Sequence, residues 1–412
     1  MRLLDLWHIT RVAMSPANGR GSRCVLESGF SAQQCSLLAL PAALAEDGVS
    51  QDRIVFGQIA AIEGPAQALG LGMRVGLLAA FEEANRLGGV RGRKLELKSA
   101  DDSYEPEKMI AAMNRMLAEE KVLAIVGPVG TPTAKAGQPI ATEAKVPFIG
   151  PFTGAEFLRN PYNRYVVNIR ASYFQETEAW IEHLTKDLGI TNIAILYQDD
   201  AFGLAGLDGV KMAMAKRNLT LAAMGAFKRN TTAVKSALLD IMKVKPGAVV
   251  TVGPYKPVAE FIKLAREVRL DAVFVAISFV GSDALAHELG TKGAGVIVSQ
   301  VVPFPGDKSI PIVASYQSAL AALDATAEPG FVSLEGYLVG RFVIEALNRI
   351  PGEPTREKLL DVIAQSGSFD IGGVKLTYGP NKNQGMDQVF FTILQADGTF
   401  KPVTRWTKMV AQ

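Results

Sequence analysis

The stretch "AIVGPVGTPTAKAGQPIATEAKVPFIG" (residues 124–150) contains a complete strand–helix–strand unit. The apolar run 122–127 predicts a strand, residues 132–144 predict a helix, and "VPFIG" (146–150) predicts a second strand. Strands that alternate with helices of this length favour a parallel sheet with helices on both faces. This stretch therefore places the chain in the α/β class.

The same alternation continues on both sides of this unit. Strands at 53–62 and 93–102 and helices at 70–87 and 106–120 precede it, and a second series follows it. Two such series predict two lobes, each with its own parallel sheet. The second series comprises strands at 192–198, 219–227, 248–253, 272–277 and 295–301 and helices at 173–188, 203–217, 231–243 and 257–268.

The end of the chain breaks the alternation. Helices at 310–323, 331–350 and 355–365 follow one another without strands, so we expect them to return to the first lobe. Strands at 387–396 and 400–405 would then join the second lobe, and the chain would cross between lobes about three times, as a hinge. The predicted division is a leader at 1–45, lobe one at 52–170 plus 304–380, and lobe two at 171–303 plus 381–405.

The first 45 residues differ from the rest of the sequence. The apolar segment "CSLLALPAALAEDG" ends in Ala43-Leu44-Ala45, which resembles a signal peptide cleaved after Ala45. Cys24 and Cys35 both lie in this leader, so a mature chain would have no thiol or disulfide. The alternative is an ordinary terminus that is not exported.

Composition excludes several classes of function. The 412 residues include 43 basic and 41 acidic side chains spread along the chain, for a net charge of +2, so we expect no nucleic-acid partner. No apolar run reaches the roughly 18 to 20 residues that a membrane span needs.

Catalytic and metal-binding signatures are missing from the sequence. "GLGMRVG" (70–76) has only a loose glycine spacing and lies in a predicted helix rather than after a strand. There is no P-loop, no GxSxG and no HExxH, and the three histidines are scattered. We therefore expect no catalytic residue, no metal and no cofactor.

The ends of the predicted strands favour ligand binding instead. Thr131, before Pro132, and Thr153, three residues before Glu156, both fit the pattern of a residue that caps a helix. The backbone N–H groups of Thr133 and Ala134 after the first threonine, and of Gly154 and Ala155 after the second, would then be free to hold a carboxylate. The alternative is that both threonines are only caps.

Aromatic residues gather near the same strand ends. Residues that follow predicted strands turn toward solvent, so packing in the core explains these rings less well than contact with a ligand. They are Phe152, Tyr173, Phe202, Tyr255 and Phe279.

From about residue 53 to residue 403 the sequence resembles the type I periplasmic solute-binding proteins, in the leucine/isoleucine/valine-binding branch. The resemblance rests on segments in the same order, including "AIVGPVGTPTAKA", "VPFIGPFTGAEFL", "NIRASYFQE" and "ILYQDDAFGLAGLDGV". It implies a clamshell of two Rossmann-like lobes joined by a three-stranded hinge. It also implies a monomer in the periplasm that binds a small solute between the lobes and delivers it to a membrane ABC permease.

The resemblance also implies the ligand residues. By position, Gly130, Thr131 and Thr133 form one loop of lobe one and Phe152, Thr153 and Gly154 form the second. Lobe two would add Phe202 and Tyr255, with Tyr173 near the crossing.

One position departs from the family pattern. Amino-acid binders of this branch have an acid after the strand that ends here at Ile277, whereas this chain has Ser278 and then Phe279. A buried ammonium without a counter-charge is costly, so an amino-acid ligand would need Asp199, Asp200 or Glu176. A carboxylate with an apolar or aromatic body, or a small amide, fits as well, and both alternatives stay open.

Two other functions are compatible with such a fold. A ligand sensor that acts on gene expression or on a signalling partner could use the same clamshell, although nothing before residue 53 resembles a helix-turn-helix. An α/β enzyme would have to turn over its ligand, and the missing signatures argue against that.

Overall fold

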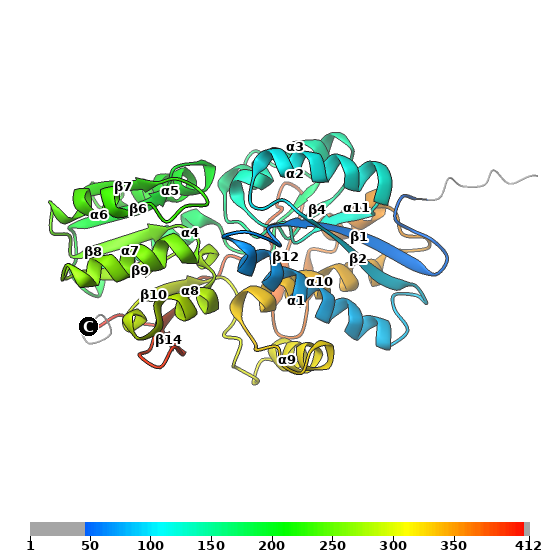
Figure 1. Ribbon diagram of the computed structural model, residues 1–412. Coiled ribbons are helices and arrows are strands. Elements are labelled where there is room, and N and C mark those ends of the chain that lie inside the picture. The colour runs from blue at the N-terminus through cyan, green and yellow to red at the C-terminus, as the bar shows by residue number, and fades with distance from the viewer. Residues whose placement is uncertain (1–45, 408–412) are drawn as a thin grey trace, which may run out of the picture. The chain divides into compact units, whose positions relative to one another are not determined.

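The computed structural model describes residues 46–407 (Figure 1). The predicted leader at 1–45, with its cleavage site and both cysteines, lies outside the described residues. The fold is mixed α/β with two sheets, as predicted, and each sheet is the core of one lobe. Below, lobe one denotes the sheet β1–β5 with helices α1–α3 and α9–α11, and lobe two the sheet β6–β10, β13 and β14 with helices α4–α8.

The sheet of lobe one has five parallel strands in the order β2-β1-β3-β4-β5. β3 and β4 are buried throughout because helices cover both faces of the sheet, which explains why their sequences are continuous apolar runs. The strands are β1 (Arg53–Ala60), β2 (Lys94–Asp101), β3 (Ala124–Val126), β4 (Phe148–Ile149) and β5 (Val166–Val167).

The helices of lobe one include a closely packed pair, α1 and α10. A Cβ atom on Gly76 of α1 would lie 1.9 Å from the carbonyl oxygen of Ser333. A Cβ on Gly336 of α10 would likewise lie 2.3 Å from the carbonyl oxygen of Met73, so glycine is required on both sides of this contact. The helices are α1 (Gln67–Arg86), α2 (Pro106–Arg115), α3 (Thr131–Glu143), α9 (Pro311–Leu323), α10 (Phe331–Arg349) and α11 (Arg356–Gln365).

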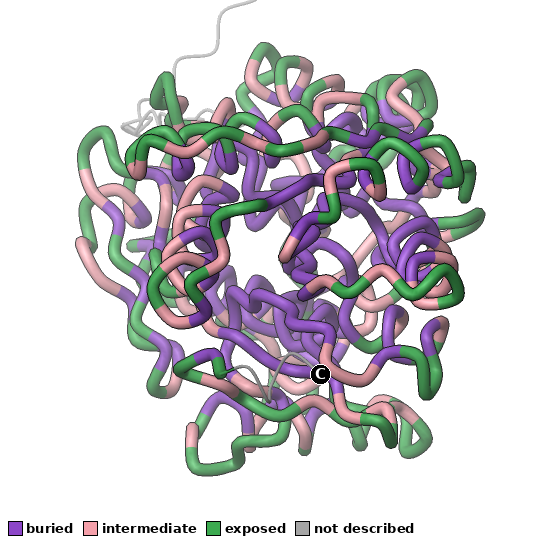
Figure 2. Tube along the Cα trace, turned by 90° about the vertical axis from the view of Figure 1, so that its left-hand side faces the viewer, coloured by how far each residue is buried: buried purple, intermediate pink, exposed green. Residues whose placement is uncertain are grey.

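The sheet of lobe two has seven strands in the order β14-β13-β10-β9-β8-β6-β7. The neighbouring strands β10, β9, β8, β6 and β7 run parallel. The last two strands of the chain, β13 and β14, join antiparallel at one edge, as predicted. Figure 2 shows buried segments gathered inside the molecule and exposed segments on its outside. The strands are β6 (Ile193–Gln198), β7 (Ala223–Phe227), β8 (Ala248–Val252), β9 (Val273–Ala276), β10 (Ile297–Gln300), β13 (Phe390–Leu394) and β14 (Phe400–Val403).

Four of the five helices of lobe two agree with the predicted ones, and one was missed. α8 (Ser282–Leu289) has only eight residues and starts from Gly281 in a left-handed conformation, so its apolar spacing is too short to predict a helix. The others are α4 (Tyr173–Lys186), α5 (Ala201–Ala215), α6 (Lys235–Met242) and α7 (Tyr255–Glu267). A small hairpin, β11 (Ser368–Asp370) with β12 (Lys375–Thr377), follows α11.

The chain passes between the lobes at residues 168–172, 301–310 and 378–389. The first and third crossings are bonded to each other. Asn168 donates its backbone N–H to the carbonyl of Asn383 at 2.7 Å and accepts from the N–H of Gly385 at 2.9 Å. These bonds tie the crossings into a hinge.

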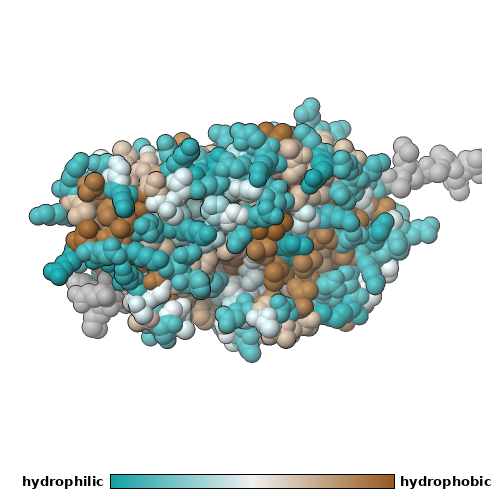
Figure 3. Space-filling model, viewed as in Figure 1, coloured by the Kyte–Doolittle hydropathy of each residue, from teal (hydrophilic) through white to brown (hydrophobic). Residues whose placement is uncertain are grey.

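Polar side chains cover most of the face in Figure 3, with apolar patches between them. Among the helices of residues 46–407, none combines the length and the apolar character needed to cross a membrane.

Candidate functional site

Two threonine hydroxyls from neighbouring loops of lobe one meet at the boundary with lobe two. Thr131 Oγ1 and Thr153 Oγ1 lie 2.6 Å apart, and both residues are fully buried. Tyr173, the first residue of α4, brings its hydroxyl to 3.4 Å from Thr131 Oγ1. The structure therefore brings together three predicted ligand residues, each with a hydroxyl that can donate to an anion.

Gly154 allows this close approach. A Cβ at Gly154 would lie 2.5 Å from Cδ1 of Tyr173 and 2.6 Å from its backbone nitrogen. Tyr173 also donates its backbone N–H to the carbonyl of Gly154 at 2.7 Å. A larger residue at 154 would push α4, and with it the Tyr173 hydroxyl, away from the hydroxyls of Thr131 and Thr153.

The predicted helix caps are wrong in detail. Thr131 is the first residue of α3, and Gly130 precedes it with φ of 114°, a conformation that glycine adopts readily. The hydroxyl of Thr133 donates to the carbonyl of Val129 at 2.7 Å instead of reaching solvent, so Thr133 supports the loop. The N–H of Ala134 is not free either, because it donates to Gly130.

Thr153 does not start an α-helix. Its hydroxyl accepts from the N–H of Ala155 at 3.2 Å, and only one 3₁₀ turn, Glu156–Leu158, follows. The reason is that the chain must turn back toward Tyr173, to which Gly154 is bonded. Consequently the N–H of Ala155 is also already used.

Phe279 of lobe two inserts its ring among aromatic side chains from both lobes. Its centroid lies 4.5 Å from that of Phe202 and 5.3 Å from that of Phe152 of lobe one. Tyr104, in the loop after β2, lies 6.0 Å away and was not predicted. Tyr173 completes the group at 5.5 Å from Phe202. The structure thus joins four of the five predicted aromatics.

Tyr255, the fifth, lies at another part of the lobe boundary. It is the first residue of α7, and its hydroxyl accepts from the backbone N–H of Ala68 near the start of α1 at 3.5 Å. Burial raises the pKa of Tyr255, so the phenol stays protonated. Its contact with lobe one is therefore with α1 rather than with the threonine pair.

A buried arginine, Arg170, lies next to the predicted site and was not predicted. Its guanidinium carbon is 5.0 Å from the ring centroid of Phe152 and 6.0 Å from that of Tyr173. Its Nη2 donates to the hydroxyl of Ser278 in lobe two. "NIRAS" gives no periodic signal, so only its place at a lobe crossing could have indicated this role.

Two glutamates accompany this arginine. Arg170 Nη2 lies 3.4 Å from Glu176 of α4, and Arg170 Nη1 lies 3.6 Å from Glu335 of α10. Burial lowers the pKa of Arg170, but the two carboxylates more than offset this, so the guanidinium stays charged. Burial raises the pKa of Glu335 to about 7, although Arg170 acts in the opposite direction.

Comparison with known proteins fits this architecture. Residues 53–399 match a family model described as periplasmic binding protein. The chain belongs to the periplasmic binding protein family. A Leu/Ile/Val-binding protein, BraC3 of Rhizobium johnstonii, is 25% identical over 82% of this chain and 91% of its own length.

Solved structures agree with this assignment. A possible leucine/isoleucine/valine-binding protein from Rhodopirellula baltica is 38% identical, with a TM-score of 0.83 over 88% of this chain and 98% of that one. An extracellular ligand-binding receptor from Verminephrobacter eiseniae is 28% identical, with a TM-score of 0.77 over 85% and 99%. These confirm the predicted clamshell and the resemblance to the Leu/Ile/Val-binding branch. The relatives are named as binding proteins and not as enzymes, in agreement with the prediction that the chain is not an enzyme.

The acids that could balance a ligand ammonium in this periplasmic binding protein are engaged or exposed. Glu176 accepts from the N–H of Ser278 at 3.0 Å and from the hydroxyls of Ser278 and Ser299 at 2.9 and 2.5 Å. Asp200 caps α5 through the N–H of Phe202 and pairs with Arg229 at 3.0 Å. Asp199 is exposed.

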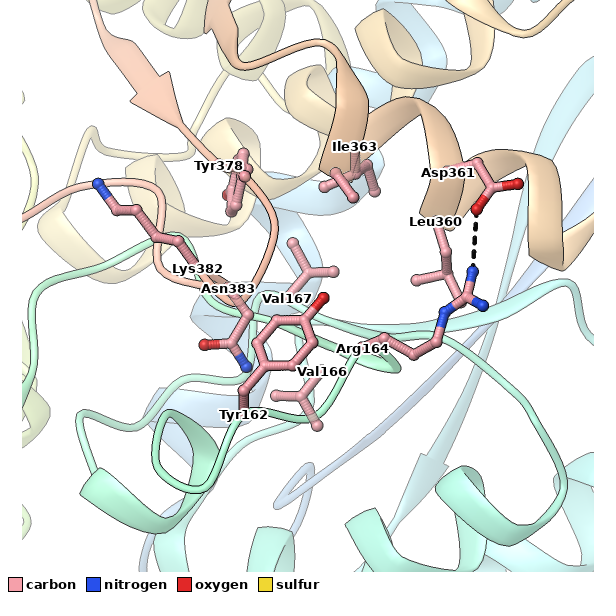
Figure 4. Close-up of a pocket in the computed structure, with 12 residues that line it drawn as sticks. Tyr162, Arg164, Val166, Val167, Leu360, Asp361, Ile363, Tyr378, Lys382 and Asn383 are labelled. Carbon is pink, nitrogen blue, oxygen red and sulfur yellow. Dashed lines mark hydrogen bonds and ion pairs between the residues drawn. The ribbon is translucent and has the colours of Figure 1, made fainter.

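A separate pocket of this periplasmic binding protein lies beside the sheet of lobe one, between residues 162–167, α11 and residues 378–383 of the third crossing (Figure 4). Its volume is about 230 Å³, and Arg164 bonds to Asp361 on its wall at 3.0 Å. None of its lining residues is a predicted ligand residue. Within residues 46–407 there is no group of three His, Cys, Asp or Glu side chains that could hold a metal.

Proposed function

We propose that this protein is the substrate-binding component of an ABC importer. It would capture a small carboxylate-bearing solute between its lobes in the periplasm and deliver it to a membrane permease as a monomer. The solute classes that fit are a branched-chain or other amino acid, an aromatic or aliphatic acid, or a small amide. The observation that supports this proposal most directly is that the buried hydroxyls of Thr131, Thr153 and Tyr173 lie together at the lobe boundary.

The arrangement suggests an order of binding. Thr131 and Thr153 belong to lobe one, so a solute can reach them while the lobes are apart. Lobe two then adds Phe202 and Phe279, which cover the solute and exclude water. Closure is a population shift in proportion to the solute's greater affinity for the closed arrangement.

The ligand-binding residues and the lobe boundaries are part of this proposal. The lobes would divide at 52–170 plus 304–380 and 171–303 plus 381–405. The proposed ligand set remains Gly130, Thr131, Thr133, Phe152, Thr153, Gly154, Tyr173, Phe202, Tyr255, Ser278 and Phe279, with Thr133 acting through the loop backbone.

A binding screen tests the proposed function. The purified protein is titrated calorimetrically with amino acids, aromatic and aliphatic acids, dicarboxylates and amides, and small-angle X-ray scattering follows lobe closure. We expect stoichiometric binding near 1 μM, about −8 kcal/mol, together with a smaller radius of gyration. Turnover of the solute, or no binding by any class, contradicts the proposal.

Location is tested separately. The full-length chain is expressed, the periplasm is extracted, and the N-terminus of the recovered protein is sequenced. We expect the protein in that extract with Glu46 as its first residue. Recovery from the cytoplasm with the leader intact contradicts export and favours a sensor.

A further inference from the structure

The donors available to a carboxylate are fewer than the threonine loops suggest. The N–H groups of Ala134 and Ala155 are bonded to Gly130 and Thr153, and the Thr131–Thr153 pair uses one of its two hydroxyl protons. What is left to a ligand is one threonine hydroxyl and the backbone N–H groups of Thr133 and Gly154. A carboxylate has about four lone-pair sites to satisfy. All of these remaining donors are neutral, so a positive charge to balance a buried carboxylate must come from a neighbouring group.

Arg170 is the neighbour that has donors to spare. It is 1% exposed, yet among residues 46–407 its Nε and Nη1 have no hydrogen-bond acceptor. A buried donor without a partner is costly, and an anionic ligand would recover that cost. The guanidinium also lies over the ring of Phe152 and donates to Ser278, both of which belong to the proposed site.

We propose, building on the proposed function, that Arg170 is a specificity determinant that contacts the ligand carboxylate, so that the site selects organic acids without an ammonium group. The acids Glu176 and Asp200 are saturated by their own partners. A cationic group on the ligand would therefore meet the guanidinium rather than a free carboxylate.

Two buried acids could support the opposite conclusion: Glu335, and Asp102 just after β2, whose Oδ2 has no hydrogen-bond partner within residues 46–407. Glu335 lies on α10 and faces Arg170 at 3.6 Å, with Glu176 of α4 and Arg159, which follows the turn Glu156–Leu158, also acting on it. An ammonium placed on Glu335 would lie next to the guanidinium of Arg170. Repulsion between the two cations makes this the weaker arrangement.

Matched ligand pairs test the proposal. The purified protein is titrated with 3-phenylpropanoate against phenylalanine and with 4-methylpentanoate against leucine, which differ only by the ammonium group. We expect at least one acid to bind tenfold or more tightly than its amino counterpart. Equal or tighter binding of the amino acids overturns the inference while the proposed function stands. No binding by either pair also overturns the inference, and the wider screen then decides whether the proposed function stands.

Variants distinguish Arg170 from Glu335. Because Glu335 lies beside Arg170 and its pKa is about 7, its ionisation should weaken binding of the acid to the wild type between pH 6 and pH 8. Glu335→Gln removes the competing carboxylate, so the acid should bind as tightly or up to about tenfold more tightly, and this pH dependence should disappear. If an ammonium ligand used Glu335, the same change would weaken binding more than tenfold.

Arg170→Gln alone leaves Glu176 and Glu335 unbalanced and could unfold the protein, so it is combined with Glu335→Gln. We expect this double variant, folded by circular dichroism, to bind the acid at least 30-fold more weakly than Glu335→Gln alone. The matched control is Arg164→Gln, because Arg164 pairs with Glu357 and Asp361 outside the cleft. Equal affinity in the double variant and in Glu335→Gln overturns the role of Arg170.

Discussion

The lobes meet in two different ways, at the centre of their boundary and at its edges. The centre consists of the threonine pair, the rings around Phe279 and the guanidinium of Arg170, all of them buried. These groups are hydroxyls, rings and unsatisfied donors, which a small solute can contact in place of one another. We therefore expect the contacts at the centre of the boundary to change when a solute binds.

The edges are joined by contacts that no ligand needs to replace. At one edge Asp283 of lobe two accepts from the N–H of Phe331, the first residue of α10, at 3.1 Å. At the other edge Arg229 of lobe two pairs with Glu105 of lobe one at 2.7 Å. The comparison teaches that the centre should control which solute binds, while the edges should control how readily the lobes close.

The largest expected effect is that of Phe279→Ala at the centre. Removing a buried phenylalanine costs about 3 kcal/mol or more, and Phe279 has contacts in both lobes, so we expect affinity for the best acid to fall about 100-fold. Calorimetry measures this loss. Phe274→Ala is the control, because Phe274 packs on Phe261 within lobe two and should lower melting temperature without lowering affinity. Similar affinity losses in both variants would mean that the loss in Phe279→Ala comes from a damaged lobe interior rather than from a lost contact with the solute.

Thr153→Val should have the next largest effect. Valine keeps the shape but loses the hydroxyl, which leaves Thr131 without its partner, so we expect about 1.4 kcal/mol and a tenfold weaker affinity. Thr251→Val is the control, because that buried hydroxyl donates to Val275 within lobe two. If Thr153→Val only lowers the melting temperature, as Thr251→Val should, Thr153 is structural.

Asp283→Asn should act mainly on the pH dependence of stability. Burial raises the pKa of Asp283 to about 6 from its ordinary 3.8, so the protonated form is favoured in the folded protein. The stabilising contribution of Asp283 to the free energy of unfolding is therefore fully present below pH 3.8 and is lost as the pH rises through about 6. Asparagine stays neutral and can still accept from Phe331, so the free energy of unfolding in urea should fall less for the variant between pH 4 and pH 6. If the free energies of unfolding of variant and wild type change in parallel with pH, the raised pKa of the buried Asp283 is contradicted.

The smallest expected effect is that of Arg229→Gln at the other edge. Arg229 is 21% exposed and its partner Glu105 is 35% exposed, and ion pairs of this kind contribute about 0 to 1 kcal/mol. We expect affinity to fall by at most about fivefold in low salt and to match the wild type in 0.5 M salt, where screening is strong. A loss above tenfold that persists in high salt would mean that this edge carries as much energy as the centre.

The sequence predicted the elements better than the contacts between them. The spacing of apolar residues and the turn residues between them indicated both sheets, because the patterns that mark strands and helices are local. The strand ends also indicated Thr131 and Thr153, since the carboxyl ends of parallel strands share one edge of the sheet.

Arg170 and Glu335 could not be predicted in the same way. Their approach depends on how α10 packs beside the first crossing, 165 residues earlier in the chain, and neither "NIRAS" nor the helix pattern of α10 indicates it. The caps at Thr131 and Thr153 failed for a related reason. A local pattern does not show that each hydroxyl already has a partner in the neighbouring loop.

Helix α10 links the centre of the boundary to one of its edges. Phe331 at its first position meets Asp283, and Glu335, one turn later, meets Arg170. The glycine contact at Gly76 and Gly336 leaves α10 no room to slide along α1. The two contacts therefore share one helix. A solute that engages Arg170 would thus act on the same helix that carries the contact with Asp283 of lobe two.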